Sequence, residues 1–213
     1  MTPPTTVNRL LSVTGVAEMP LVEEPLAPPA PGEVTVAVAY CGICGSDFPR
    51  YFDGGVHSFP QVLGHEFSGV VVALGEGVAG VALGTRVAVA PLSPCHGCEA
   101  CAAGHYSLCP RYTFIGSRRQ GALATYVNAP AANLVPLPDG MRLRDAALVE
   151  PLTVAIHGLE RADYTGVDRA AVFGAGVIGL LAIQTLKARG VRHVTAIDVQ
   201  PDKLDLARRL GAD

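Results

Sequence analysis

The chain has 213 residues, 49% of them hydrophobic, and a net charge of −3. It is longer than one small domain, and its apolar content is enough for a sizeable buried core. A weakly acidic charge with 6% aromatic residues lacks the basic footprint of a nucleic-acid-binding protein, and no apolar run is long enough to span a bilayer. We therefore expect neither nucleic acid nor a membrane as a partner.

The first part of the chain has the pattern of a β-rich domain. Runs rich in β-branched residues, separated by glycine, proline and polar clusters, predict strands at 34–40, 67–74, 85–90 and 122–127. We expect these strands to form one domain over residues 1–149, with functional groups on its loops.

The pattern changes to alternating helices and strands after about Pro138. Helices are predicted at 151–162, 177–189 and 201–210, and short buried strands at 170–173 and 194–197. This order is the beginning of a parallel α/β domain over residues 150–213. Because a complete nucleotide-binding sheet has more than two strands, we expect the sequence to stop partway through this domain.

Four cysteines occupy one short segment, at Cys95, Cys98, Cys101 and Cys109. Four thiolates at this spacing complete the tetrahedral shell of a zinc ion and leave no open position for a substrate. The sequence therefore predicts a structural zinc site that stabilises the fold. Disulfide pairing is the alternative, and a cytoplasmic protein that uses its thiolates for metal is the simpler interpretation.

A glycine-rich string links a predicted strand to a predicted helix, and it contains Gly174, Gly176, Val177, Ile178 and Gly179. In this context the glycines allow a tight turn, close approach of a pyrophosphate and close helix packing, while the helix N-terminus faces the phosphates. Asp198 ends the following predicted strand, where a carboxylate binds the ribose 2′-hydroxyl and repels a 2′-phosphate. We predict NAD rather than NADP, with a helix N-cap as the alternative role of Asp198.

A catalytic zinc site is predicted from Cys44, His65 and Glu150, because such a site needs three protein ligands and an open position. Cys44 lies in a glycine-flanked loop, His65 precedes a strand, and Glu150 begins the segment that joins the two domains. The alternatives are a packed core histidine and a glutamate stabilised at a helix N-terminus. A redox pair of Cys41 with Cys44 is a further alternative.

Together these strings resemble the zinc-containing medium-chain alcohol and polyol dehydrogenases. They are CGICGSD at 41–47, GHE at 64–66, the four-cysteine segment, EPLTVAIH at 150–157 and GAGVIG at 174–179. The resemblance covers almost the whole chain and implies a GroES-like catalytic domain followed by the first part of a Rossmann domain. It also implies a homodimer or homotetramer, and a longer chain that completes both domains.

The resemblance assigns roles residue by residue. Cys44 and His65 match the catalytic zinc ligands, and Glu150 matches the glutamate that the polyol branch binds directly or through water. Glu66 matches an acid that can exchange into the zinc shell, and Ser46 matches the hydroxyl that passes on the substrate proton. Val154 falls where a residue packs on the nicotinamide, and Pro49 stands near the position of the alcohol branch's relay histidine.

The implied activity is reversible oxidation of a secondary alcohol with zinc and NAD. Zinc lowers the pKa of the substrate hydroxyl, and Ser46 or a water oriented by Glu150 accepts the proton before hydride transfer to the cofactor.

The expected substrate is a polyol or polyol phosphate. Arg50, Arg118 and Arg119 are candidates for binding a phosphate, because a guanidinium pairs with it through two hydrogen bonds, although solvated loop arginines are the alternative. Sorbitol-like polyols, amino-cyclitols and threonine are competing substrates. A truncated, non-catalytic zinc-binding module is the competing function.

Overall fold

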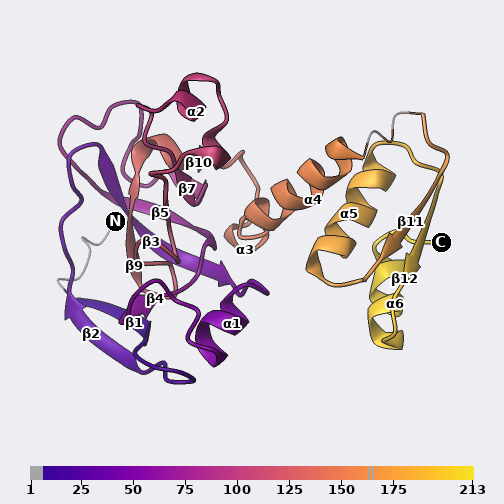
Figure 1. The fold of residues 1–213 in the computed structure, drawn as a ribbon. Coiled ribbons are helices and arrows are strands. Elements are labelled where there is room, and N and C mark those ends of the chain that lie inside the picture. Colours follow the sequence, from indigo (N-terminus) through magenta and orange to yellow (C-terminus); the bar gives the residue numbers. More distant parts are fainter. Residues whose placement is uncertain (1–6, 163, 165) are drawn as a thin grey trace. The chain divides into compact units, whose positions relative to one another are not determined.

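The computed structural model describes residues 7–162, 164 and 166–213, and the chain divides into two compact units, Met1–Leu148 and Val149–Asp213 (Figure 1). The predicted boundary between residues 149 and 150 lies one residue from this division. The first unit is β-rich and the second alternates helices with parallel strands, which confirms the predicted fold class. Within the described residues, no helix has both the length and the apolar character that crossing a bilayer requires.

A five-stranded antiparallel sheet forms the centre of the first unit. Its strand order is β10-β6-β5-β3-β9, and the strands are β3 (Glu33–Gly42), β5 (Glu66–Leu74), β6 (Arg86–Val89), β9 (Tyr126–Pro130) and β10 (Leu134–Pro136). Three of these strands coincide closely with the predicted runs at 34–40, 67–74 and 85–90. The longest pairing joins β3 to β5, with Cys41 opposite Phe67 and Gly42 opposite Glu66.

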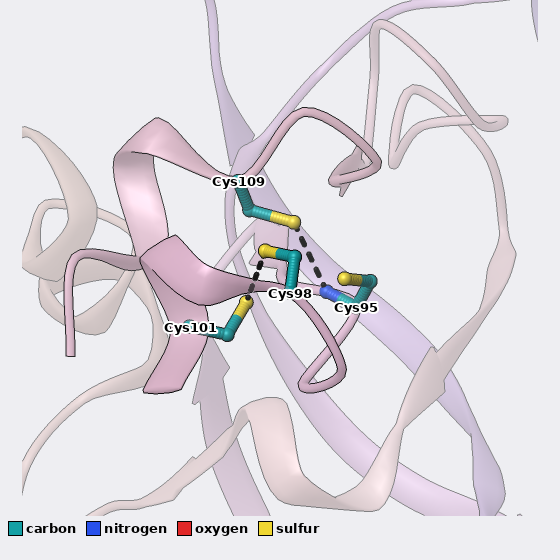
Figure 2. A group of neighbouring side chains, drawn as sticks. All are labelled: Cys95, Cys98, Cys101 and Cys109. Atoms are coloured by element: carbon teal, nitrogen blue, oxygen red, sulfur yellow. Dashed lines mark hydrogen bonds between the residues drawn. The ribbon is translucent and has the colours of Figure 1, made fainter. Parts of the chain in front are cut away.

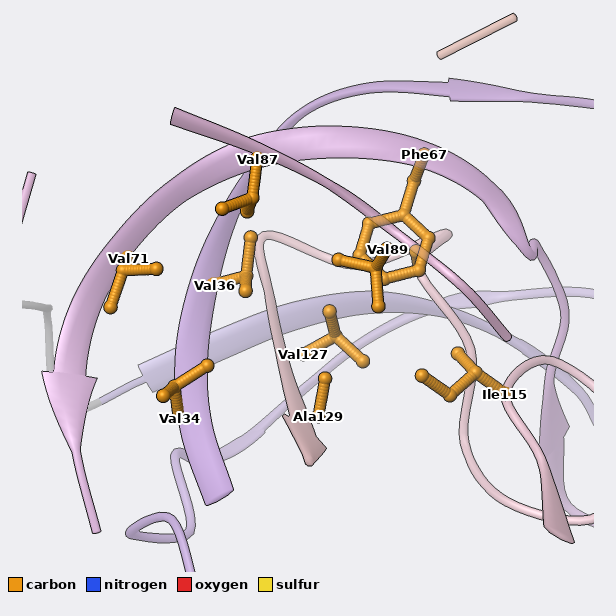
Figure 3. Packing of buried hydrophobic residues seen from close by; sticks show 10 residues of the cluster. Val34, Val36, Phe67, Val71, Val87, Val89, Ile115, Val127 and Ala129 are labelled. Carbon is orange, nitrogen blue, oxygen red and sulfur yellow. The ribbon is translucent and has the colours of Figure 1, made fainter. Parts of the chain in front are cut away.

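The core of the first unit lies on one side of this sheet, where valines from several strands face one another (Figure 3). Val34, Val36, Val71 and Val87 have no exposed surface, and Phe67 packs among them. β-Branched side chains suit this surface because their fixed rotamers pack well across neighbouring strands. The packed sheet gives the loops at its ends a rigid base.

Smaller elements complete the first unit. They are β1 (Val7–Val13), β2 (Leu21–Pro25) and β4 (Gln61–Val62) in a second sheet, the pair β7 (Leu92–Ser93) and β8 (Thr113–Phe114), the helices α1 (Asp47–Phe52), α2 (Glu99–Ala102) and α3 (Leu143–Ala146), and the 3₁₀ turns η1 (Tyr106–Leu108) and η2 (Ala131–Asn133). The helix α1 and the strands β1 and β2 were not predicted.

The strand predicted at 122–127 is wrong over most of its length, since β9 covers Tyr126–Pro130. The backbone amides of Ala122 and Leu123 instead donate to the carbonyls of Gly64 and Leu63. Residues 121–123 therefore pair with the loop before β5, and this distant partner overrides the local strand preference.

The second unit begins with α4 (Val149–Arg161) and continues through β11 (Arg169–Phe173), α5 (Val177–Ala188), β12 (His193–Ile197) and α6 (Pro201–Arg209). β11 and β12 pair in parallel, and Ile183, Leu186 and Val194 form part of the core between helix and strands. Gly190 follows the end of α5 in the left-handed region, with φ of 89°, which is the usual conformation of a glycine just after a helix.

Candidate metal centres and nucleotide loop

The four predicted cysteines converge in one lobe of the first unit. The lobe is the loop between β7 and β8. The sulfur atoms of its four cysteines all lie within 4.8 Å of one another, and the cysteines are Cys95, Cys98, Cys101 and Cys109 (Figure 2). Tetrahedral zinc with Zn–S bonds of about 2.3 Å places its sulfurs about 3.8 Å apart. The cluster therefore fits a closed four-thiolate zinc site. The six cysteines all lie in the described part of the chain and are free thiols there, so none of the alternative disulfides is formed among the described residues.

Hydrogen bonds and burial act in opposite directions on the thiols of this cluster. The Cys95 amide donates to the Cys109 sulfur at 3.3 Å, and the Cys98 and Cys101 sulfurs are 3.4 Å apart. A backbone hydrogen bond at Gly97 is the main cause that lowers the pKa of Cys95 to about 6, whereas burial raises the pKa of Cys101 to about 11. Because these pKa values differ so widely, the four thiols are not all deprotonated near neutral pH on their own. A bound metal ion displaces the remaining protons.

A second group joins Cys44, His65 and Glu66, whose ligand atoms also lie within 4.8 Å of one another. His65 and Glu66 are buried, and Cys44 is partly buried. The group forms because β3 pairs with the start of β5, which sets Glu66 opposite Gly42 and brings the Cys44 loop beside His65. One thiol, one imidazole and one carboxylate are ligands that zinc accepts.

The surroundings of His65 favour a neutral imidazole. Burial lowers the pKa of His65, although the Asp47 carboxylate acts in the opposite direction. Its buried Nδ1 has no hydrogen-bond partner among the described residues, and the nearest carboxylate oxygen, on Asp47, is 3.8 Å away. A neutral imidazole with one nitrogen facing a carboxylate is the form that binds a metal through its other nitrogen.

Asp47 is a buried carboxylate beside this group, and it was not among the predicted site residues. It accepts a hydrogen bond from the Cys44 amide at 3.0 Å and pairs with Arg50 at 3.3 Å. Arg50 also donates to the Ser46 hydroxyl at 2.7 Å. These contacts tie the loop that carries Cys44 and Ser46 to the first turn of α1. Asp47 ends the CGICGSD string at 41–47, but the helix that it begins was not predicted, so nothing local in the sequence indicated this role.

Two glycines make room for the second group. A Cβ atom on Gly42 would lie 2.4 Å from the Glu66 carboxylate, so the absent side chain leaves space for that carboxylate. Gly64 has φ of 93°, and a Cβ there would lie 2.7 Å from the Cys41 sulfur and 2.9 Å from the Leu123 amide nitrogen. The residue before His65 therefore has to be glycine.

Burial also distinguishes the two cysteines of the predicted CxxC string. It raises the pKa of Cys41 to about 12, and the Asp47 and Glu66 carboxylates add to this effect. The Cys41 thiol donates to the Gly42 carbonyl at 3.4 Å and packs against the core. Cys41 is therefore a protonated, packed thiol, whereas the Cys44 sulfur lies with the ligand atoms of His65 and Glu66.

The remaining predicted zinc ligand, Glu150, lies in the second unit. It occupies the first turn of α4 and is half-buried, and Val154 follows on the same helix with half of its surface exposed. The zinc role of Glu150 and the nicotinamide contact of Val154 stay predictions.

The glycine string forms the turn between β11 and α5 in the second unit. Gly174 has φ of 89°, and a Cβ on Gly179 would lie 1.8 Å from the Gly174 carbonyl oxygen, so the helix can pack here only on glycine. A Cβ on Gly176 would meet nothing within 4 Å. The loop thus offers open backbone at the N-terminus of a twelve-residue helix, which fits a pyrophosphate.

Asp198 lies at the end of β12 and faces this loop. Its carboxylate accepts hydrogen bonds from the Ala175 amide at 2.7 Å and from the Gln200 amide at 2.9 Å, and the former is the main cause that lowers its pKa. The N-cap of α6 is Gln200 rather than Asp198. An ionised carboxylate is therefore held beside the glycine loop.

The two loop arginines have different environments. Arg119 pairs with Glu33 at 2.9 Å and donates to the Asn128 carbonyl at 2.8 Å, so it links β3 and β9. Arg118 is exposed and lies over the Tyr112 ring at 4.2 Å. The guanidinium of Arg118 is therefore accessible to a ligand, whereas that of Arg119 is already bound by other residues of the chain. Their role in substrate binding stays a prediction.

Known proteins match this chain over most of its length. The family model "Alcohol dehydrogenase GroES-like domain" matches residues 30–139. Galactitol 1-phosphate 5-dehydrogenase of Escherichia coli (strain K12) is 47% identical over 180 residues, which are 84% of this chain and 52% of that protein. A probable D-xylulose reductase A of Emericella nidulans is 37% identical over 215 residues, covering 98% of this chain and 60% of that protein. The chain thus spans little more than half the length of these relatives.

Solved structures agree in fold. The crystal structure of galactitol-1-phosphate dehydrogenase from Escherichia coli superposes with a TM-score of 0.91 and 41% identity, covering 96% of this chain and 59% of that one. The short chain alcohol dehydrogenase rspB from E. coli CFT073, complexed with NADH, has a TM-score of 0.91 and 33% identity, covering 98% of this chain and 62% of that one.

Proposed function

The chain belongs to the zinc-containing medium-chain alcohol and polyol dehydrogenases with a GroES-like domain, and from this premise we propose that it oxidises a secondary alcohol of a polyol phosphate with NAD. A compound like galactitol 1-phosphate is the model substrate, by analogy with the relative of that name. The observation that carries the proposal is the convergence of Cys44, His65 and Glu66 on one point of the first unit.

Three protein ligands are proposed for the catalytic zinc: Cys44, His65 and Glu150. Glu66 lies with the first two and is the carboxylate proposed to exchange with Glu150 in the shell. Burial raises the pKa of Glu66, although a hydrogen bond with Cys44 acts in the opposite direction. Zinc at this site supplies Lewis-acid polarisation of the substrate hydroxyl.

Ser46 is proposed to relay the proton of the substrate hydroxyl: its Oγ accepts that proton as it gives up its own. Arg50 already donates to its Oγ, so one lone pair of the hydroxyl is occupied and its own proton points elsewhere. Pro49 stands near the place of a relay histidine, so we propose that the proton leaves Ser46 to solvent. Asp47 fixes this arrangement by holding both Arg50 and the Cys44 amide.

In the second unit, the glycine string and Asp198 are proposed to hold NAD. The backbone at Gly174 and Gly176 leaves space for the pyrophosphate, and the first amides of α5, at Val177 and Ile178, have no partner within the helix by its geometry. The nicotinamide supplies hydride acceptance when bound. Val154 is proposed to pack on its ring and Asp198 to bind the ribose.

Replacing Asp198 with asparagine tests this choice of cofactor. The change removes the charge that repels a 2′-phosphate but keeps one acceptor oxygen for the Ala175 amide. We expect the ratio of kcat/KM for NADP to that for NAD to rise about tenfold or more. Asp205→Asn, which removes an exposed carboxylate paired with Arg208, is the matched control. An unaltered cofactor ratio in Asp198→Asn would remove this residue from the ribose site.

The substrate class is tested by comparing polyols with polyol phosphates, with NADH formation as the signal. We expect a lower KM for the phosphates, and we expect Arg50→Gln to raise that KM by about tenfold to a hundredfold while leaving the KM for plain polyols nearly constant. Arg118→Gln is a parallel variant at the exposed loop cation. Because Arg50 also contacts Ser46, its loss is expected to lower kcat for both classes.

Two outcomes contradict these assignments separately. Equal changes in KM for both classes would show that neither arginine recognises phosphate. No NADH formation from any polyol, in protein shown to contain zinc, would contradict the dehydrogenase function itself.

Two further expectations complete the proposal. The family membership is the basis for expecting a homodimer or homotetramer. The use of thiolates as metal ligands is the basis for expecting the cytoplasm, where thiols stay reduced.

A further inference from the structure

Arg111 lies in the four-cysteine lobe, two residues after Cys109, and has no part in the function proposed above. One nitrogen of its guanidinium is 3.4 Å from the Cys95 sulfur and 3.3 Å from the Gly97 carbonyl oxygen. Its partners in the described part of the chain are thus a sulfur and a carbonyl rather than a carboxylate. A cation placed in this way is oriented toward the metal-binding thiolates.

The charge of the lobe explains why a cation belongs there. Four thiolates around one divalent zinc leave a net charge of −2 on the complex. Hydrogen bonds from nearby amides disperse part of this charge, as the Cys95 amide does for Cys109. A guanidinium adjacent to Cys95 supplies a full positive charge as well as a charge-assisted hydrogen bond.

The architecture of the lobe gives the same contact a mechanical role. The lobe is closed at its base by β7 and β8, where Leu92 pairs with Phe114 and Ser93 with Thr113. Inside this base the regular elements are only α2, with four residues, and η1, with three. Helices this short do not hold themselves together. The bond from Arg111 to the Gly97 carbonyl therefore connects the loop after the first ligand to the segment after the last one.

We propose that Arg111 is a positioning residue of the four-cysteine site, which balances the charge of the metal-bound thiolates and fastens the two ends of the lobe. The proposal concerns how firmly this site retains zinc. It is independent of whether the chain is a dehydrogenase.

The test measures the rate of zinc transfer from the protein to a chromogenic chelator, in a Cys44→Ser background that removes the other proposed site. We expect Arg111→Gln to release zinc about tenfold faster than the parent, because outer contacts of metal ligands have effects of this size. Arg111→Lys, which keeps the charge but not the planar fork, is expected to lie between them. Arg142→Gln removes an exposed arginine paired with Asp145, and it serves as the matched control at the parent rate.

A second measurement keeps the proposal testable if the glutamine variant folds poorly. Arg111 is exposed, so salt screens its charge, and the parent is expected to release zinc faster as ionic strength rises from about 0.01 M to about 1 M. Arg111→Gln should lose most of this salt dependence. The proposal is overturned if Arg111→Gln and Arg142→Gln release zinc equally fast, or if salt leaves the parent rate constant.

Discussion

Replacing Cys44 with serine is expected to remove one zinc ion per chain and to lower kcat/KM for the alcohol substrate on the order of a thousandfold or more. A serine hydroxyl stays protonated near neutral pH and is a poor zinc ligand, so His65 and the carboxylates would have to hold the ion without a thiolate. Zinc content of the purified protein and steady-state kinetics are the two measurements.

Cys41→Ser is the matched control for this change. Cys41 lies in the same CxxC string, but its thiol is packed, protonated and bonded to the Gly42 carbonyl. The control should keep the full zinc content and most of the activity. The catalytic zinc site is contradicted if Cys44→Ser retains as much zinc as Cys41→Ser, or if the control loses the ion and Cys44→Ser does not.

Replacing Cys109 with serine is expected to lower the thermal midpoint of the first unit by about 10 °C. Cys109 is buried, with 1% of its surface exposed, and its sulfur also accepts a hydrogen bond from the Cys95 amide. Loss of one thiolate opens the closed shell, and the binding energy of a structural zinc is folding energy. Thermal unfolding followed by circular dichroism, together with zinc content, measures the effect.

Removal of zinc by a chelator tests whether loss of the metal causes the lower thermal midpoint. A strong chelator should lower the midpoint of the parent protein toward that of Cys109→Ser and should change the variant little. Cys41→Ser again measures the cost of a thiol-to-hydroxyl exchange away from zinc. A midpoint for Cys109→Ser within about 2 °C of the parent would show that the lobe needs no metal.

Elements with a strong local pattern were predicted well. The valine-rich strands near 34–40 and 67–74 and the helix that Gly190 ends all occur where the pattern places them. The strand predicted at 122–127 failed because its first residues bond to the loop that contains Leu63 and Gly64. No window of sequence contains both partners of that pairing.

The candidate sites divide in the same way. Four cysteines within one short segment indicate their own site, because a loop of that length can bring its thiols to one ion. The contacts of Asp47 with the Cys44 amide and with Arg50 were not predicted, since burial of an acid at a helix start depends on packing. The engagement of Arg119 by Glu33 was likewise invisible in a glycine-bounded basic loop.

From sequence alone came the kinds of group available: the thiolate lobe, the glycine turn with its acid, and the alternation of strands and helices. Each depends on residues close together along the chain, where spacing restricts geometry directly. The resemblance placed Glu66 near the zinc shell, but only the tertiary structure brings its carboxylate within 4.8 Å of the Cys44 and His65 ligand atoms, since the pairing of Gly42 with Glu66 sets that distance. Strand register depends on the burial of whole faces across the sheet, so it is a property of the folded core and not of any local string.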